Sequence, residues 1–281
     1  MKTNDTFSMT RAAAYARLVM ITNRKTLLAM VAALFGVMLF MVVVPPLTDH
    51  IYTIKDYDYS GDDPYWSDEF SSFATLFLLF MAYTGAMFYS GAQGKDKRIL
   101  TFMVPASNLE KFAALFVVYT VLPVVAFIVL SFAADYIRVF IASLYAAEDI
   151  VVAPISFSYL INFGESDYLT SEDIVRIRIL YLSFVAFATS FFTLGSIVWY
   201  KRTFQKSIVF GIVLFIALFI FFLWGVDVFA EKFGDINKRL DILVEQVDFA
   251  MITGCFTTTL ALLFYWISYV RFKESEIVNR W

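Results

Sequence analysis

Six long apolar segments, separated by polar and charged ones, dominate the pattern of this 281-residue chain. Each holds about 20 residues or more, the length a helix needs to cross the hydrocarbon core of a bilayer. The pattern predicts an all-α membrane protein with six transmembrane helices in a single domain over residues 1–281. The predicted spans are Thr26–Leu47, Phe70–Tyr89, Phe112–Phe132, Ile174–Tyr200, Ile208–Val226 and Phe249–Val270. Pro45-Pro46 is expected to end the first span, and the third helix can continue to Leu144.

Composition supports the membrane class. Apolar residues make up 60% of the chain, with 32 phenylalanines, and the mean hydropathy is +0.71. A soluble globular domain has an apolar content of roughly 45–50%. A chain of this length could not bury so much apolar surface in water, so a soluble fold is excluded.

The segment before the first span mixes apolar and basic residues over 7–23. Leu18 and Ile21 can share one helical face with Phe7 and Ala14, whereas the arginines of the segment lie elsewhere. This arrangement predicts an N-terminal helix lying in the membrane interface. The alternative is a cytoplasmic extension of the first span.

The charges between the spans predict the topology. With both termini in the cytoplasm, most of the 22 lysines and arginines lie inside and most of the 25 acidic residues lie outside. This agrees with the excess of basic residues in cytoplasmic loops.

Two outer segments have patterns of their own. Apolar residues from Phe229 to Val247 recur at helical spacing and predict an amphipathic outer helix. The acidic loop 56–69 matches half of a calcium-loop pattern, but Ser67 stands where a bidentate glutamate is expected, so a solvated loop is favoured.

Residues suited to catalysis or metal binding are scarce. The chain has one histidine, His50, and one cysteine, Cys255, so it has no zinc motif. His50 stands at the outer end of the first span, whereas an intramembrane serine protease needs a histidine inside the bilayer. Gly94-Lys95 does not follow the spacing of a phosphate-binding loop. We therefore expect no enzyme activity, no cofactor and no nucleic-acid partner. Any ATP that drives this protein would be bound by another subunit.

Few charged residues lie within the predicted spans. Asp135 and Arg138 stand three residues apart towards the outer end of the third helix, and Arg176 and Arg178 begin the fourth span. We expect local pairing of Asp135 with Arg138, or snorkelling to the interface. Ser196 has no histidine partner, and a small residue at this place favours close helix packing or the end of the span.

The segment Gly91–Lys111 is unlike a simple connector. It begins with a basic cluster, continues through an apolar run, and then reaches Pro105. Ser107 or Asn108 can cap the helix that follows, with Glu110 in its first turn. The residues alone leave two interpretations open. The segment is either a lever that connects the cytoplasmic surface rigidly to the third span, or an interfacial turn held by snorkelling lysines.

The string KRILTFMVPASNLEKF, from Lys97 to Phe112, resembles the loop after the second span of bacterial type-2 ABC exporter permeases. A second string, from Phe191 to Lys206, resembles a small six-span subgroup of these permeases. The basic pair Lys97-Arg98 departs from the family, where the corresponding residue is often acidic. The predicted outer amphipathic helix also replaces a segment that is often re-entrant in the family.

The resemblance implies a permease subunit of the bacterial inner membrane. In the family, this subunit works as a dimer with two ATP-binding subunits, and the loop after span two forms a coupling helix against the ATPase. The expected partners are thus an ABC ATP-binding subunit, a second permease copy or paralogue, and membrane lipid.

The implied substrate is an unidentified amphiphile (a lipid, a peptide or a drug-like molecule). The alternative is a non-transporting membrane scaffold or immunity protein of the same fold. The expected ATPase contacts are Lys97, Arg98, Thr101, Pro105, Ser107, Asn108, Glu110 and Lys111, with Lys201, Arg202 and Lys206 as a secondary cytoplasmic contact.

Overall fold

The computed structural model describes residues 7–48, 63, 65–89, 104–146, 150–156, 171–199, 202–232 and 249–278. Every regular element within these ranges is helical. In chain order the elements are α1 (Met9–Thr22), α2 (Arg24–Thr48), α3 (Trp66–Met87), α5 (Asn108–Phe116), the π-helical turn η2 (Val117–Val121), α6 (Leu122–Ala142), α8 (Ser171–Val198), α9 (Thr203–Lys232) and α11 (Phe249–Val278).

Five helical stretches among the described residues are long and apolar enough to cross a membrane. They are Arg24–Thr48, Trp66–Met87, Asn108–Ala142, Ile174–Val198 and Met251–Glu274. An all-helical chain with several such stretches is typical of a polytopic membrane protein. The fifth predicted span lies within α9, whose described apolar part is Thr203–Leu214. The count of six spans and the sides on which the termini lie therefore stay predictions. Residues 233–247 of the predicted outer helix lie outside the described residues, as do residues 56–62 of the acidic loop and His50. The prediction of a solvated loop is wrong for residues 66–69, because they begin α3 and Glu69 is buried there.

Two boundaries test the sequence analysis directly. Pro45 and Pro46 do not end the first apolar helix, because α2 contains both and ends at Thr48. The third apolar helix does continue beyond its predicted span, running from Asn108 to Ala142 through the π-helical turn. At 1.5 Å per residue, its 35 residues extend about 52 Å, well beyond a hydrocarbon core of about 30 Å. This helix is therefore longer than the apolar layer of a membrane is thick.

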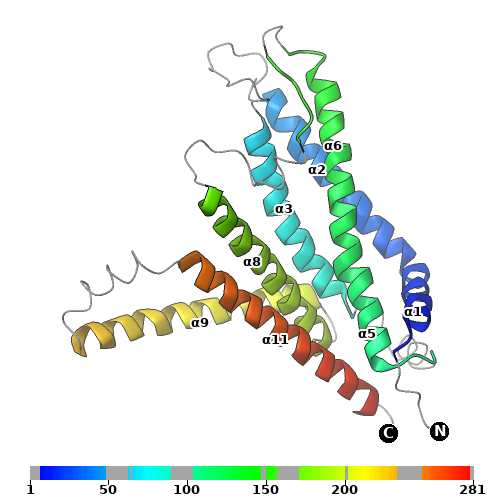
Figure 1. Cartoon of the computed structure of the whole chain (residues 1–281), viewed down its shortest axis with the longest axis vertical. Coiled ribbons are helices and arrows are strands. Elements are labelled where there is room, and N and C mark those ends of the chain that lie inside the picture. The colour runs from blue at the N-terminus through cyan, green and yellow to red at the C-terminus, as the bar shows by residue number, and fades with distance from the viewer. Residues whose placement is uncertain are drawn as a thin grey trace.

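The helices form one bundle (Figure 1). Helices α2, α3 and α6 lie together, α8 packs against both α3 and α11, and α1 lies along α5. Helix α9 begins against α8 and α3 and then extends away from the bundle. The beginning of α1 and the end of α11 lie at the same end of the molecule (Figure 1).

Small residues allow close approach of the helices around α8. A Cβ atom added at Gly85 of α3 would lie 2.6 Å from the carbonyl oxygen of Thr189 in α8. A Cβ atom added at Gly195 would collide with the hydroxyl of Ser207 in α9. Between α8 and α11, Thr257 donates a hydrogen bond of 2.9 Å to the hydroxyl of Ser183. Glycine and hydroxyl side chains at such contacts are characteristic of helix packing inside membranes.

Ser196 fits the same pattern. Its side chain is buried, and its hydroxyl donates to the carbonyl of Thr193 at 2.7 Å. The neighbouring Gly195 provides the close approach to Ser207 of α9, which fits the packing alternative.

Two apolar clusters hold the bundle at its opposite ends. The first joins α1, the end of α3, α5 with η2, and the end of α11, with Phe88 and Phe272 fully buried. The second joins α2, α3 and α6, with Met38, Val42 and Phe127 in its interior. Each apolar cluster lies next to a buried group of charged side chains, and these two polar groups are the most distinctive features of the fold.

Candidate functional site

The structure describes only part of the predicted ATPase contact. Lys97, Arg98, Thr101 and Lys201 lie outside the described residues. The segment from Val104 leads directly into α5, and Arg202 and Lys206 lie at the start of α9. Arg202 and Lys206 are both exposed, and Arg202 has a left-handed backbone with φ of 53°.

The turn before α5 is organised by a capping box, which includes one of the two predicted cap residues. Ser107 Oγ accepts a hydrogen bond of 3.3 Å from the backbone N–H of Glu110. In return, Glu110 Oε2 accepts one of 2.8 Å from the backbone N–H of Ser107. This reciprocal pair satisfies two donors that the first turn of a helix would otherwise leave unpaired. Ser107, rather than Asn108, is therefore the cap.

The second oxygen of Glu110 binds α1, almost 100 positions earlier in the chain. Glu110 Oε1 accepts hydrogen bonds from the backbone N–H of Ser8 at 2.7 Å and from Arg11 Nη2 at 2.8 Å and Nε at 3.2 Å. The side chain of Glu110 is fully buried, while that of Arg11 keeps 39% exposure. A buried carboxylate is tolerated only when its charge is paired and its oxygens accept hydrogen bonds. We call this group of Ser8, Arg11, Ser107 and Glu110 the Glu110 junction.

Helix α1 complements the Glu110 junction with an apolar face. Ala12, Tyr15 and Val19 are buried against the rest of the chain. The opposite face exposes Leu18 and Ile21, the residues that the sequence analysis assigned to an interfacial helix. A helix in this segment is confirmed, and it is separated from α2 at Asn23; its place in the membrane interface stays a prediction. Its apolar outward face fits the boundary of a membrane.

The predicted contact residues divide into buried and exposed ones. Glu110 and Lys111 are buried in this chain, so the carboxylate of Glu110 serves an internal junction. Pro105 and Leu109 are exposed on the same turn. A contact between this turn and an ATPase subunit stays a prediction, and Pro105 and Leu109 are the described side chains that offer it a surface.

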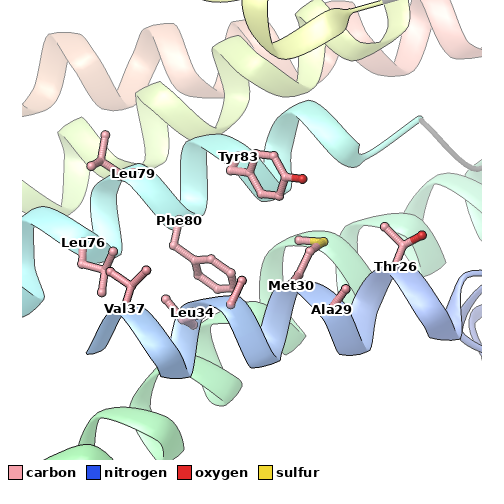
Figure 2. A pocket seen from close by; sticks show the side chains of 10 residues that line it. Thr26, Ala29, Met30, Leu34, Val37, Leu76, Leu79, Phe80 and Tyr83 are labelled. Carbon is pink, nitrogen blue, oxygen red and sulfur yellow. The ribbon is translucent and has the colours of Figure 1, made fainter. Parts of the chain in front are cut away.

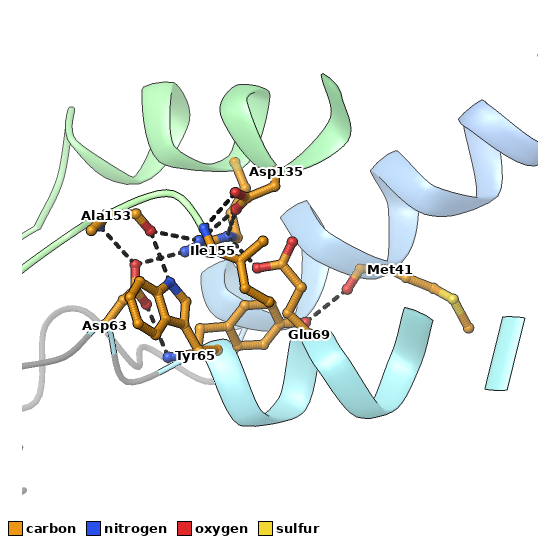
Figure 3. A network of polar contacts seen from close by, with 9 residues as sticks. Met41, Asp63, Tyr65, Glu69, Asp135, Ala153 and Ile155 are labelled. Atoms are coloured by element: carbon orange, nitrogen blue, oxygen red, sulfur yellow. Dashed lines mark hydrogen bonds and ion pairs between the residues drawn. The ribbon is translucent and has the colours of Figure 1, made fainter. Parts of the chain in front are cut away.

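A second polar group lies at the other end of the long helix. Arg138 is 28 residues from Glu110 along continuous helix, which corresponds to about 42 Å. Its guanidinium contacts three carboxylates: Asp63 Oδ2 at 2.9 Å, Glu69 Oε2 at 3.0 Å and Asp135 Oδ1 at 2.6 Å. All four side chains are at most 1% exposed. We call these four residues the Arg138 cluster (Figure 3).

The segment 150–156 closes the Arg138 cluster from a third side. The backbone N–H of Ala153 donates to Asp63 Oδ2 at 3.0 Å, and that of Ile155 donates to Asp135 Oδ2 at 2.7 Å. The carbonyl of Ala153 accepts from Arg138 Nη2 at 3.0 Å. The cluster thereby joins three parts of the chain: α3 with the residues before it, α6, and the segment 150–156.

Tyr65 connects this cluster to α2. Its ring lies 5.7 Å from the guanidinium carbon of Arg138, a distance that allows a cation–π interaction. Its hydroxyl donates a hydrogen bond of 2.8 Å to the carbonyl of Met41. In a regular helix that carbonyl would accept from residue 45, but Pro45 has no N–H. Tyr65 thus replaces the hydrogen bond that Pro45 removes, which explains why α2 continues through its prolines.

Part of the Arg138 cluster was predictable from the sequence. The predicted pairing of Asp135 with Arg138 is confirmed, and Arg176 pairs loosely with Glu172 at 3.7 Å. Asp63 and Glu69 were missed, because both belong to an acidic stretch that resembles a solvated loop. The available signal was Arg138 itself, since an arginine in an apolar helix requires neutralising partners.

An apolar groove lies between α2 and α3 (Figure 2). Its volume is about 390 Å³. The lining side chains are mostly aliphatic or aromatic, and Thr26 and Tyr83 bring hydroxyl groups to it. The full lining is Thr26, Ala29, Met30, Ala33, Leu34, Val37, Leu76, Leu79, Phe80 and Tyr83.

These features define a helical membrane protein with a buried polar junction at each end of its longest helix. Comparison of the chain with protein-family models, with curated proteins and with solved structures gives no match.

Proposed function

We propose that this chain is the membrane-spanning permease subunit of an ABC exporter, which moves an amphiphilic substrate with energy from a separate ATP-binding subunit. The proposal rests on the resemblance of residues 97–112 to the coupling segment of type-2 ABC permeases. The structural observation that best supports it is the Glu110 junction, because the same residues that carry the resemblance are joined to both α1 and the third membrane helix.

Force applied to the turn before α5 would pass into both α1 and the long helix. Glu110 lies in the first turn of a helix that continues without a break to Ala142. Its other oxygen is bonded to the start of α1. A displacement of the exposed residues Pro105 and Leu109 would therefore move α1 and the long helix together. A connection that bends freely would lose such a movement, whereas a capped and buried one transmits it.

The apolar groove between α2 and α3 is evidence in favour of an amphiphilic substrate. Its walls suit a hydrocarbon chain, and the hydroxyl-bearing residues Thr26 and Tyr83 lie along it (Figure 2). The lining offers no charged side chain, so any charged part of the substrate would remain outside the groove.

Site-directed cross-linking with a cassette ATPase expressed from a neighbouring gene tests the proposal. Single cysteines would be introduced at Pro105 and Leu109 in a C255S background, because the native Cys255 is exposed. Both should cross-link to the ATPase. The matched control is L144C, because Leu144 is 73% exposed at the opposite end of the long helix. This variant should not cross-link.

ATP hydrolysis provides the second measurement. The assembled complex in nanodiscs should hydrolyse ATP faster than the ATPase alone, and E110Q should reduce this stimulation while the complex still forms. If no ATPase co-purifies and variants at Pro105 and Leu109 behave as wild type, the proposal fails. A non-transporting scaffold or immunity protein would then be the better assignment.

A further inference from the structure

The three carboxylates of the Arg138 cluster differ in their hydrogen-bond partners. Asp63 accepts hydrogen bonds from Tyr65 N, Ala153 N and Arg138 Nη1. Asp135 accepts from Arg138 Nε and Nη2 and from Ile155 N. Glu69 accepts no hydrogen bond from any described residue, although it is completely buried. Among the described residues, Glu69 lies close to one positive charge, at an ion-pair distance of 3.0 Å from Arg138 Nε. Asp135 Oδ1 lies at the same distance from that nitrogen.

The charges of the Arg138 cluster do not balance if every group is ionised. One guanidinium faces three carboxylates, and all four side chains are shielded from solvent. A buried ionised carboxylate without hydrogen bonds is strongly unfavourable. When carboxylates share a site, the energetic conflict is relieved if one of them takes a proton. Glu69 is the carboxylate best placed to take this proton, because the oxygens of both aspartates already accept hydrogen bonds.

We propose that the Arg138 cluster is a proton-binding site, in which Glu69 holds the proton and shares it with Asp135. Protonation turns Glu69 from an acceptor without donors into a hydroxyl donor beside an ionised acceptor. It also removes one of the two excess negative charges. No bond other than the O–H bond is made or broken, and the proton comes from water.

The surroundings of Glu69 contain few other titratable groups. Helix α6 contributes Asp135 and Arg138, and the residues before α3 contribute Asp63 and Tyr65. Tyr145 lies near Arg138 and Asp63. Near the cluster, the described parts of α2 and of segment 150–156 supply backbone groups, namely the carbonyl of Met41 and the amides of Ala153 and Ile155 (Figure 3). Glu69 is thus the described group whose ionisation would change the balance of charge in the cluster.

Loss of this proton would weaken the junction that the cluster makes. A second excess negative charge would then lie beside Asp135, within the contact that joins α3, α6 and segment 150–156. The folded protein should therefore be most stable when Glu69 is protonated, and its stability should fall as the pH rises and the proton is removed. This inference does not rest on the proposed transport function.

Infrared spectroscopy of the full-length protein in detergent tests the proposal. The wild type at neutral pH should show the carbonyl stretch of a protonated carboxylic acid, and E69Q should lose this band. The control is D68N on the same helical turn, because Asp68 is exposed; it should keep the band. A wild-type spectrum without such a band, or a band that E69Q leaves unchanged, would overturn the proposal.

Thermal unfolding as a function of pH gives a second measurement that does not need a folded variant. The Tm of the wild type should fall between about pH 6 and about pH 10, a range in which ordinary surface carboxylates are already ionised. Where E69Q folds, its Tm should vary less over this range, whereas D68N should follow the wild type. A wild-type Tm that stays constant or rises over this range would contradict proton binding by Glu69.

Discussion

The hydroxyl of Tyr65 donates a hydrogen bond of 2.8 Å to the carbonyl of Met41, which has no helical donor because residue 45 is proline. The two residues lie on different sides of a polar segment, 24 positions apart. The bond fixes the end of α2 to the start of α3, and the same tyrosine ring covers Arg138. The side chain of Tyr65 therefore supplies the hydrogen bond that α2 lacks at Pro45, and its ring packs against the guanidinium of Arg138.

This relationship predicts that the cost of Tyr65→Phe depends on Pro45. Alone, Y65F should lower the free energy of unfolding by about 1–3 kcal/mol, because the partly buried carbonyl of Met41 loses this donor. In a P45A background, residue 45 supplies the helical N–H, so Y65F should cost less. Reversible unfolding in mixed micelles measures the double-mutant cycle. Y136F is the control, since Tyr136 is 62% exposed. Equal costs in both backgrounds would disprove the replacement of one hydrogen bond by the other.

A second prediction concerns the contact of α3 with α8. Gly85→Ala should destabilise the protein by about 1–3 kcal/mol, because the added methyl group meets the backbone carbonyl of Thr189 and forces the helices apart. Gly36→Ala is a matched control, since a Cβ atom there meets nothing within 4 Å. At that helix position alanine should be neutral or stabilising by up to about 1 kcal/mol. Thermal unfolding in the same detergent distinguishes the two, and a G85A protein as stable as G36A would show that the contact is looser than described.

The Glu110 junction predicts coupling between Arg11 and Glu110. E110Q and R11Q should each lower the Tm, because each leaves one member of the pair without its charged partner. The double variant should lose less than the sum of the two single losses. The control pair is R271Q and E274Q. Arg271 Nη1 lies 3.2 Å from Glu274 Oε2, and the two side chains are 64% and 52% exposed. That surface pair should show weak coupling. Strictly additive losses for Arg11 and Glu110 would contradict a direct interaction.

The geometry of the Arg138 cluster predicts that lysine cannot replace arginine. Arg138 reaches Asp63, Glu69, Asp135 and the carbonyl of Ala153 with three different nitrogens. A lysine has a single nitrogen, so R138K should cost about 3 kcal/mol or more by leaving buried carboxylates unpaired. R271K is the control, because Arg271 is 64% exposed and its ion pair with Glu274 lies at the surface. Its cost should stay within about 0.5 kcal/mol. Equal yields and equal Tm values of the two variants would argue against a buried cluster.

The sequence by itself determined the helical class and the position of most apolar helices, and it placed the cap of α5 at Ser107 or Asn108. These features are local. A run of about 20 apolar residues is sufficient to predict a membrane helix, and short polar side chains just before an apolar run are sufficient to predict a helix cap. The pairing of Asp135 with Arg138 was also predictable, because both residues lie on adjacent turns of one helix.

Tertiary structure alone decided which charged residues are buried and what they contact. Asp63 and Glu69 do not differ in sequence pattern from the exposed Asp68, yet only they face Arg138. Glu110 was expected at a partner surface, but α1 covers it through contacts that span 99 and 102 positions. The continuation of α2 through Pro45 likewise depends on a tyrosine from another segment. Burial and long-range pairing result from how the helices pack together, and the periodicity of a single segment contains no information about its neighbours.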